Sequence, residues 1–239
     1  MLGNFWWRGQ HDGVQLAFTA SAAGNLSQSV GPTGQGLKSR RQLETELGLG
    51  PGQLRFLNQV HSADALDADS AGSAVPTGDA WVTAEGTPIA VLVADCLPVL
   101  FVGSTPQGRL VTAAAHAGRP GLIAGILEGT VHALRSRGAE SITAWVGPGA
   151  CGDCYEVPQQ MFDELTAARP ALASTTSWGT PALDLRAEAN AVLSAAGAMV
   201  INAAAGCTIE DPALFSHRRS QKTGEPEGRL AGLIWAQRR

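Results

Sequence analysis

The stretch IAVLVADCLPVLFVGSTPQGRLVTAAAHAGRPG, from Ile89 to Gly121, decides the fold of this chain. It contains three apolar runs that are rich in β-branched residues, and each is shorter than the roughly 20 residues that span a membrane. Each run is therefore predicted to be a buried strand. Asp95 and Cys96 separate the first two runs, and His116 ends the third. A Cys and a His at the ends of rigid strands can form a preorganised site.

The rest of the chain alternates between apolar and polar segments that predict further strands and helices. The additional strands are expected at 14–19, 54–60, 79–83, 141–146, 199–201 and 230–235, and the helices at 37–47, 122–135, 158–168 and 185–196. Residues 21–36 and 211–229 are polar and read as long loops. Several strands follow one another without a helix between them, which favours mixed β-sheets flanked by helices over a regular βαβ array. No flexible linker divides the chain, so we expect one α/β sandwich domain over 1–239.

Composition limits the partners and the compartment. The net charge is −4 and no long Lys/Arg block occurs, so nucleic acid is not an expected partner. The N-terminus lacks a signal-peptide pattern and no apolar run reaches membrane-spanning length, so we expect a cytoplasmic protein without a membrane partner. Its four cysteines are then expected to be reduced. A monomer or weak oligomer that acts on a small molecule is the expected form.

A third candidate ligand, His61, follows the strand-like run LRFLNQV. One Cys thiolate and two imidazoles suit a zinc site whose open fourth position takes water or substrate. Zinc would lower the pKa of that water toward ~7. His61, Cys96 and His116 are far apart in the chain and do not follow a zinc-finger spacing. The residues alone slightly favour the alternative of a buried Cys and two structural histidines.

Asp95 interrupts a strongly apolar run, where an unpaired carboxylate would be costly. It either orients a ligand histidine, acts as an acid or base, or caps backbone N–H groups at a strand end. Cys151-Gly-Asp-Cys154 is a C-x-x-C motif for which redox and metal roles are possible, and a structural or incidental role is favoured. In Phe215–Arg219, His217 and Arg218 suit an anion, with an exposed basic loop as an equal alternative.

Several motifs occur together in one order along the chain. They are NQVHSADA (58–65), ADCLPVLF (94–101), AAHAGRPGL (114–122), VGPGACGDCYEV (146–157) and FSHRR (215–219). In this combination the chain, from about Gly13 to Trp235, resembles the YfiH-type laccase-domain family. The resemblance implies an α/β sandwich with mixed sheets, and metal ligands at His61, Cys96 and His116.

The resemblance also implies an activity. It suggests a zinc-dependent purine nucleoside enzyme that phosphorolyses adenosine, inosine or methylthioadenosine and deaminates adenosine. Asp95, Cys96 and His116 are then the expected catalytic residues. Asn25, Arg40, His217 and Arg218 are the residues expected to bind substrate or phosphate. The chain departs from the family pattern at Arg119-Pro120, where relatives carry Trp and Arg.

Other functions remain open. Copper-dependent polyphenol oxidation ranks lower, because a multicopper enzyme needs many histidines and this chain has five. A third alternative drops the metal and uses Cys96 as nucleophile with His116 as base, editing a peptidoglycan precursor. A non-enzymatic alternative is a metal or redox sensor that uses Cys151 and Cys154.

Overall fold

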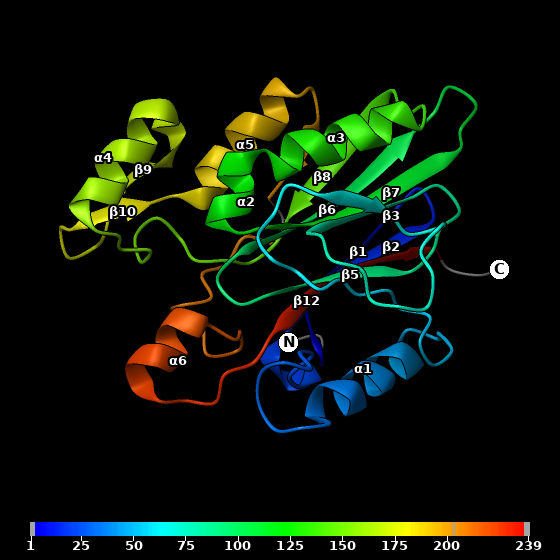
Figure 1. Cartoon of the computed structure of the whole chain (residues 1–239), viewed down its shortest axis with the longest axis horizontal. Helices are drawn as coiled ribbons and strands as arrows, with labels where there is room; N and C mark the ends of the chain where they lie inside the picture. Colours follow the sequence, from blue (N-terminus) through cyan, green and yellow to red (C-terminus); the bar gives the residue numbers. More distant parts are fainter. Residues whose placement is uncertain (1–2, 203, 237–239) are drawn as a thin grey trace.

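Two large β-sheets pack face to face, and helices cover their outer surfaces (Figure 1). The computed structural model describes residues 3–202 and 204–236. In the view of Figure 1, α1 (Gln35–Glu46) lies on one side of the sheets, and α2 (Arg119–Ala124), α3 (Ile126–Ser136) and α5 (Leu185–Ala195) lie on the other. This arrangement is the α/β sandwich with mixed sheets that the sequence predicts.

The first sheet has four strands and is antiparallel throughout. Its order is β1 (Phe5–His11), β2 (Val14–Thr19), β12 (Leu230–Ala236) and β5 (Ile89–Val93). The second sheet has six strands, and only its two outermost pairs are parallel. Its order is β11 (Met199–Ile201), β8 (Ser141–Val146), β6 (Leu97–Ser104), β7 (Leu110–Ala117), β4 (Ala80–Thr83) and β3 (Ala65–Asp67).

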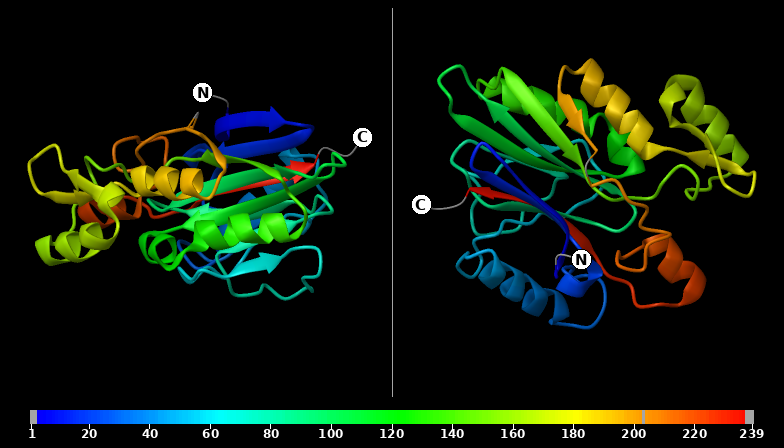
Figure 2. Two further views of the ribbon diagram at one scale, coloured as in Figure 1. Left: turned by 90° about the horizontal axis from the view of Figure 1, so that it is seen from above. Right: turned by 180° about the vertical axis from the view of Figure 1, so that it is seen from behind.

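The remaining elements lie at the ends of the sandwich. They are α4 (Gln159–Ala168), the hairpin of β9 (Ala173–Thr175) and β10 (Pro181–Leu183), α6 (His217–Thr223), and the short 3-10 helices η1 (Ser21–Ala23) and η2 (Pro170–Leu172). The yellow-green α4, β9 and β10 stay together at one end of the molecule in every view (Figure 2). No helix in the described part of the chain is long and apolar enough to cross a membrane.

The central strands are apolar on both sides because each separates two layers of core. On β6, Val99 and Phe101 face the core under the helices, whereas Leu100 and Val102 face the core between the sheets. On the first sheet, Ala90 of β5 faces the core under α1. A strand buried on both faces reads as a continuous apolar run, as this stretch does.

Four local predictions differ from the structure. Residues 54–60 are not a strand and make only isolated bridges, such as that between Arg55 and Ile89. The predicted helix 122–135 is two helices, because Gly125 adopts a left-handed conformation with φ 94° that ends α2. The polar segment 211–229 contains α6, and the strands β1, β3, β9 and β10 were not predicted. In β1 the exposed and half-buried residues alternate, which leaves no strong apolar run.

Asp69 fixes the turn that leads from β4 into β5. Its carboxylate accepts hydrogen bonds from the Thr83 and Thr87 hydroxyls and from the Ala84 N–H. Burial alone would raise the pKa of Asp69, but these hydrogen bonds lower it below the ordinary value of 3.8. The ionised carboxylate therefore stabilises the folded chain.

Replacing Asp69 with Asn should lower the free energy of unfolding by about 2 kcal/mol at pH 7, because the amide cannot accept all of these hydrogen bonds. The contribution of Asp69 is complete above pH 3.8 and is lost as the pH falls through the lower folded-state pKa. Urea unfolding of both proteins should show the difference narrowing in acid. A constant difference down to pH 3 would contradict it. Asp64→Asn is the control, since Asp64 is exposed and its carboxylate has no partner among the described residues.

Candidate metal centre

His61, Cys96 and His116 come together in space. Their donor atoms all lie within 4.8 Å of one another. The Cys96 Sγ is 3.7 Å from the His61 Nε2, and the two imidazole rings meet edge to face with centroids 4.7 Å apart. Cys96 directly precedes β6, and His116 lies near the end of β7, opposite Pro98 in the antiparallel register. The β6–β7 pair therefore places two of the three donors, and a loop delivers His61.

Asp79 positions both histidines. Its side chain is fully buried, and its Oδ1 lies 2.7 Å from the His116 Nδ1 and accepts a hydrogen bond from the His61 backbone N–H. Its Oδ2 accepts from the N–H groups of Val60 and Ser62. Burial alone would raise the pKa of Asp79, but its hydrogen bonds, that of His116 foremost, lower the pKa to about 2. An ionised carboxylate accepts a hydrogen bond from the Nδ1–H of His116, which makes Nε2 the ring nitrogen available to a metal.

Two residues at this site adopt left-handed backbone conformations. His61 has φ 61° and Asp95 has φ 81°. Such conformations cost about 1–3 kcal/mol each and persist where the surroundings fix them. Gly118 has no room for a side chain, since a Cβ there would lie 2.5 Å from the His61 Cδ2 and 2.9 Å from the Cys96 Sγ. The backbone is therefore shaped to bring these donors together.

The electrostatics of the pair Cys96 and His116 favour a thiolate. Burial raises the pKa of Cys96, but hydrogen bonds with His116 and His61 outweigh it and bring the pKa to about 6. Burial lowers the pKa of His116, and the hydrogen bonds with Asp79 and Cys96 raise it to about 9. A thiolate is the form in which Cys96 would bind a zinc-type ion, and such an ion would displace the proton that the raised pKa keeps on His116. The donor set of one sulfur and two nitrogens fits a three-ligand metal site with an open position.

A pocket of about 730 Å³ opens beside the three donors. All three donors line it, together with Arg40 from α1, His217 from α6 and Arg229. Its other lining residues are Ser27, Gln28, Ser29, Val30, Leu57, Asn58, Gln59, Val75, Leu92, Val93 and Ala94. The volume lies within the range of about 300–1,000 Å³ that is typical of small-molecule sites.

Two predicted substrate-binding residues point elsewhere. Asn25 is buried and holds the early loop, because its side chain donates to the Val30 carbonyl and accepts from the N–H groups of Ser27 and Arg229. Arg218 donates to the Glu156 carbonyl and stacks on the Tyr155 ring at 5.3 Å. Neither residue is among those that line the pocket in the described part of the chain.

Asp95 contacts neither ligand histidine. Its carboxylate accepts hydrogen bonds from the Thr208 hydroxyl at 2.6 Å and from the Arg218 N–H at the start of α6 at 2.7 Å. These contacts match its interpretation as a backbone cap. They fix the turn that carries Cys96 and tie it to α6.

Asp79, the carboxylate that orients His116, was not among the site residues predicted from the sequence. Its signal was a single acidic residue directly before the wholly buried strand β4. Arg119, at the departure from the family pattern, reaches away from the pocket and donates to the Met161 sulfur at 2.9 Å. Neither it nor Pro120 lines the pocket among the described residues.

Replacing Asp79 with Asn should lower the affinity for zinc by about 10–100-fold, because His116 loses its carboxylate partner. The free energy of unfolding should also fall by about 3 kcal/mol, since an amide nitrogen would face buried N–H groups. Competitive titration with a zinc indicator and urea unfolding measure the two effects. Asp64→Asn is again the matched control and should change neither. Unchanged zinc affinity in a folded Asp79→Asn protein would contradict this role.

The chain is similar to several known proteins. A protein named purine nucleoside phosphorylase from Streptomyces coelicolor is 43% identical over 217 residues, covering 88% of this chain and 87% of that protein. Another of the same name from Corynebacterium glutamicum is 38% identical, covering 93% and 94%. The crystal structure of a Neisseria meningitidis protein matches with a TM-score of 0.81 at 30% identity, covering 98% and 100%. Residues 8–237 match the family model described as multi-copper polyphenol oxidoreductase laccase, and the chain belongs to that family.

Proposed function

We propose that this protein is a zinc-dependent purine nucleoside phosphorylase. One observation carries the proposal: a single pocket joins the cluster of His61, Cys96 and His116 to the guanidinium of Arg40. A metal-ligand set and an anion-binding side chain on one small-molecule pocket suit a reaction between phosphate and a nucleoside. The relatives named purine nucleoside phosphorylase support the same activity.

Arg40 is the side chain best placed to hold phosphate. Its Nε donates to the Leu26 carbonyl at 2.8 Å and its guanidinium lies over the Phe56 ring, 3.7 Å from the centroid. Its two terminal nitrogens have no partner among the described residues. Burial lowers the pKa of Arg40 to about 10, so it stays charged at neutral pH. A fixed guanidinium with two free nitrogens can bind a phosphate in a bidentate manner.

Two other basic side chains at the pocket share one carboxylate. The His217 Nδ1 lies 2.7 Å from the Glu227 Oε1, and the Arg229 Nη1 lies 2.8 Å from the same oxygen. Glu227 offsets the charge of Arg229, which leaves Arg40 as the stronger phosphate ligand. A histidine oriented by a glutamate can also donate a proton to a leaving group, as a general acid. We assign His217 to the purine side of the reaction.

The apolar wall of the pocket suits the purine ring. Leu57, Val75, Leu92 and Val93 contribute to it. Gln59 is committed to the backbone of Leu92 at both ends of its amide, so it shapes this wall. An apolar wall with a few polar groups is typical of small-molecule sites.

In the reaction, an oxygen of phosphate forms a bond to the ribose C1′ while the bond from C1′ to the purine breaks. The electron pair of the broken bond goes to the purine, and a proton from His217 neutralises it. Arg40 holds the phosphate in line with C1′, which lowers the barrier by positioning. Asp95 acts as a positioning residue, because it fixes the turn that carries Cys96.

A zinc ion held by His61, Cys96 and His116 would supply Lewis acidity toward an oxygen of the bound reactants. Two imidazoles and one thiolate are compatible with copper as well. We favour zinc because three protein ligands with an open position are the usual catalytic zinc site. Phenol oxidation is the second outcome to be tested with copper-loaded protein.

Adenosine deamination stays a prediction. Zinc deaminases use a glutamate next to the metal to move protons. None of the described residues that line this pocket carries a carboxylate. Phosphorolysis needs no such group, which is why it leads.

The activity test uses zinc-loaded protein with inosine or adenosine and phosphate. We expect ribose 1-phosphate and free purine base from the wild type and none from Cys96→Ala. If the wild type forms no more product than Cys96→Ala does, the proposal is wrong. Release of purine without phosphate consumption would point to hydrolysis instead. Copper-loaded protein should not oxidise phenols.

Arg40→Gln should raise the KM for phosphate by about 10–100-fold, because a charge-assisted pair of hydrogen bonds is worth about 1.5–3 kcal/mol. The KM for the nucleoside should change much less. Arg41→Gln is the matched control, since Arg41 is the next residue, is exposed and does not line this pocket. Initial rates at varied phosphate measure the effect, with thermal unfolding to confirm that both variants fold. Equal phosphate KM values in the two variants would exclude Arg40 as the phosphate ligand.

A further inference from the structure

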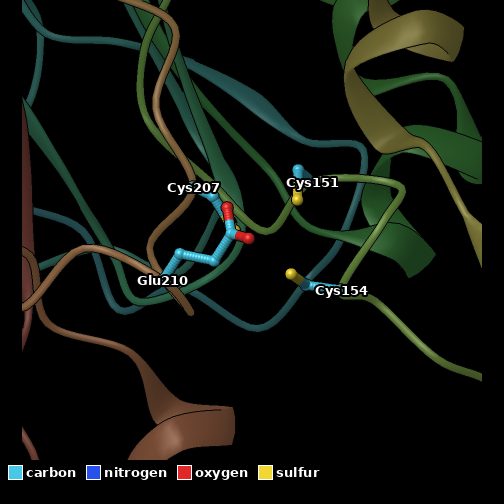
Figure 3. Close-up of side chains that lie close together, drawn as sticks. All are labelled: Cys151, Cys154, Cys207 and Glu210. Carbon is cyan, nitrogen blue, oxygen red and sulfur yellow. The ribbon is translucent and has the colours of Figure 1, made fainter. Parts of the chain in front are cut away.

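Three cysteines and a glutamate form a second cluster outside the pocket. Cys151 and Cys154 lie in the loop after β8, and Cys207 and Glu210 lie in the loop after β11. Their donor atoms all lie within 4.8 Å of one another. Figure 3 shows the sulfurs of Cys151 and Cys154 facing each other, with the Glu210 carboxylate extending toward the same space. All three cysteines are free thiols.

Backbone hydrogen bonds hold the two loops in this arrangement. The N–H groups of Cys154 and Tyr155 both donate to the Cys151 carbonyl, which closes a tight turn around the C-x-x-C motif. Gly149 pairs with the other loop, because its N–H donates to the Gly206 carbonyl and its own carbonyl accepts from the Thr208 N–H. The donors are therefore brought together by the fold before any ligand binds.

The ligand set selects the class of ion. Three sulfurs and one carboxylate oxygen make a closed set of four donors, the coordination number of structural zinc sites, with a carboxylate in the place that a fourth Cys or a His usually takes. Thiolate-rich sites favour zinc over hard cations such as Mg²⁺ or Ca²⁺. A tetrahedral ion with Zn–S bonds of about 2.3 Å keeps its sulfurs about 3.8 Å apart, so these donors need to close by about 1 Å at most.

The surroundings suit the charge of such a site. A divalent cation offsets half of the charge of three thiolates and a carboxylate. Arg186 lies beside the cluster and interacts electrostatically with Cys151 and Cys207. Its Nη2 donates to the carbonyl of Gly206, the residue before Cys207. A half-buried guanidinium at this place lowers the cost of the remaining negative charge.

We propose that Cys151, Cys154, Cys207 and Glu210 form a second metal site, which binds one zinc-type divalent ion and has a structural role. The site shares no residue with the pocket and does not depend on the proposed reaction. It joins the loop after β8 to the loop after β11. Both loops hold Asp95, since the Ala150 N–H donates to its carbonyl and the Thr208 hydroxyl to its carboxylate. The ion thereby supports the turn that carries Cys96.

The decisive experiment uses the full-length Cys96→Ala protein, reduced and stripped of metal, so that only the second cluster retains thiols. Anaerobic titration with Co²⁺ should produce a thiolate-to-cobalt charge-transfer band and the visible bands of a tetrahedral ion. Both should saturate at one equivalent, and Zn²⁺ should displace the cobalt. Absence of the bands overturns the proposal. A disulfide among these cysteines in protein that resists metal loading, detected by mass spectrometry, overturns it as well.

Substitutions identify the ligands. In the Cys96→Ala background, Cys154→Ser and Cys207→Ser should each weaken the charge-transfer band, and Glu210→Gln should weaken Co²⁺ binding at least tenfold. Glu85→Gln is the matched control, since Glu85 is exposed and lies outside the cluster. Equal Co²⁺ affinity in the two glutamine variants removes Glu210 from the site. If the serine variants do not fold, the unmodified cluster and the exposed Glu210 still decide the question.

Discussion

The hydrogen bonds of the buried Asp79 carboxylate are the interactions on which the candidate site depends. It accepts hydrogen bonds from three consecutive backbone N–H groups, at residues 60–62, and its Oδ1 also lies against the His116 Nδ1. Burying a charge is costly unless hydrogen bonds compensate it. Here the hydrogen bonds come from the loop that carries His61 and from the imidazole of His116. The same contacts therefore stabilise the buried charge and fix the geometry of the candidate metal ligands. His61 keeps its left-handed conformation because this carboxylate holds its N–H.

The layers could be predicted from the sequence because the central strands carry their own signal. Strands β5, β6 and β7 are buried along nearly their whole length, and their continuous apolar runs follow directly from that burial. The edge strand β1 gives no comparable run, because one of its faces is open to solvent. Residues 54–60 look like a strand by composition, yet their apolar side chains fill core beneath a loop that makes only isolated bridges. Leu54, Phe56 and Leu57 are buried and Val60 is exposed, but the strand predicted there does not form.

Some site residues could also be predicted from local sequence, and others could not. Cys96 and His116 lie at facing ends of neighbouring strands, so local reasoning brings them together. The position of His61 depends on a long-range contact with Asp79. The only sequence signal for this contact is one acidic residue before β4. Arg40 and His217 reach the pocket from helices on separate segments, so residue chemistry could suggest anion binding for His217 but could not place the two side chains in one pocket. Asn25 and Arg218 were predicted to bind substrate, but the Asn25 amide holds the early loop and the Arg218 Nη1 donates to the Glu156 carbonyl.

The place of β12 has a consequence for how the chain folds. This strand lies between β2 and β5, and the Ala231 N–H donates to the Thr19 hydroxyl across 212 residues. During synthesis the hairpin of β1 and β2 therefore has an unpaired β2 edge and an exposed apolar face until β12 emerges from the ribosome. Sheets built on such distant pairings form slowly, because the loop must close before its contacts compensate. Exposed strand edges at that stage are open to pairing with other chains. Nascent chains of this protein should therefore need chaperone protection until their last strand is made.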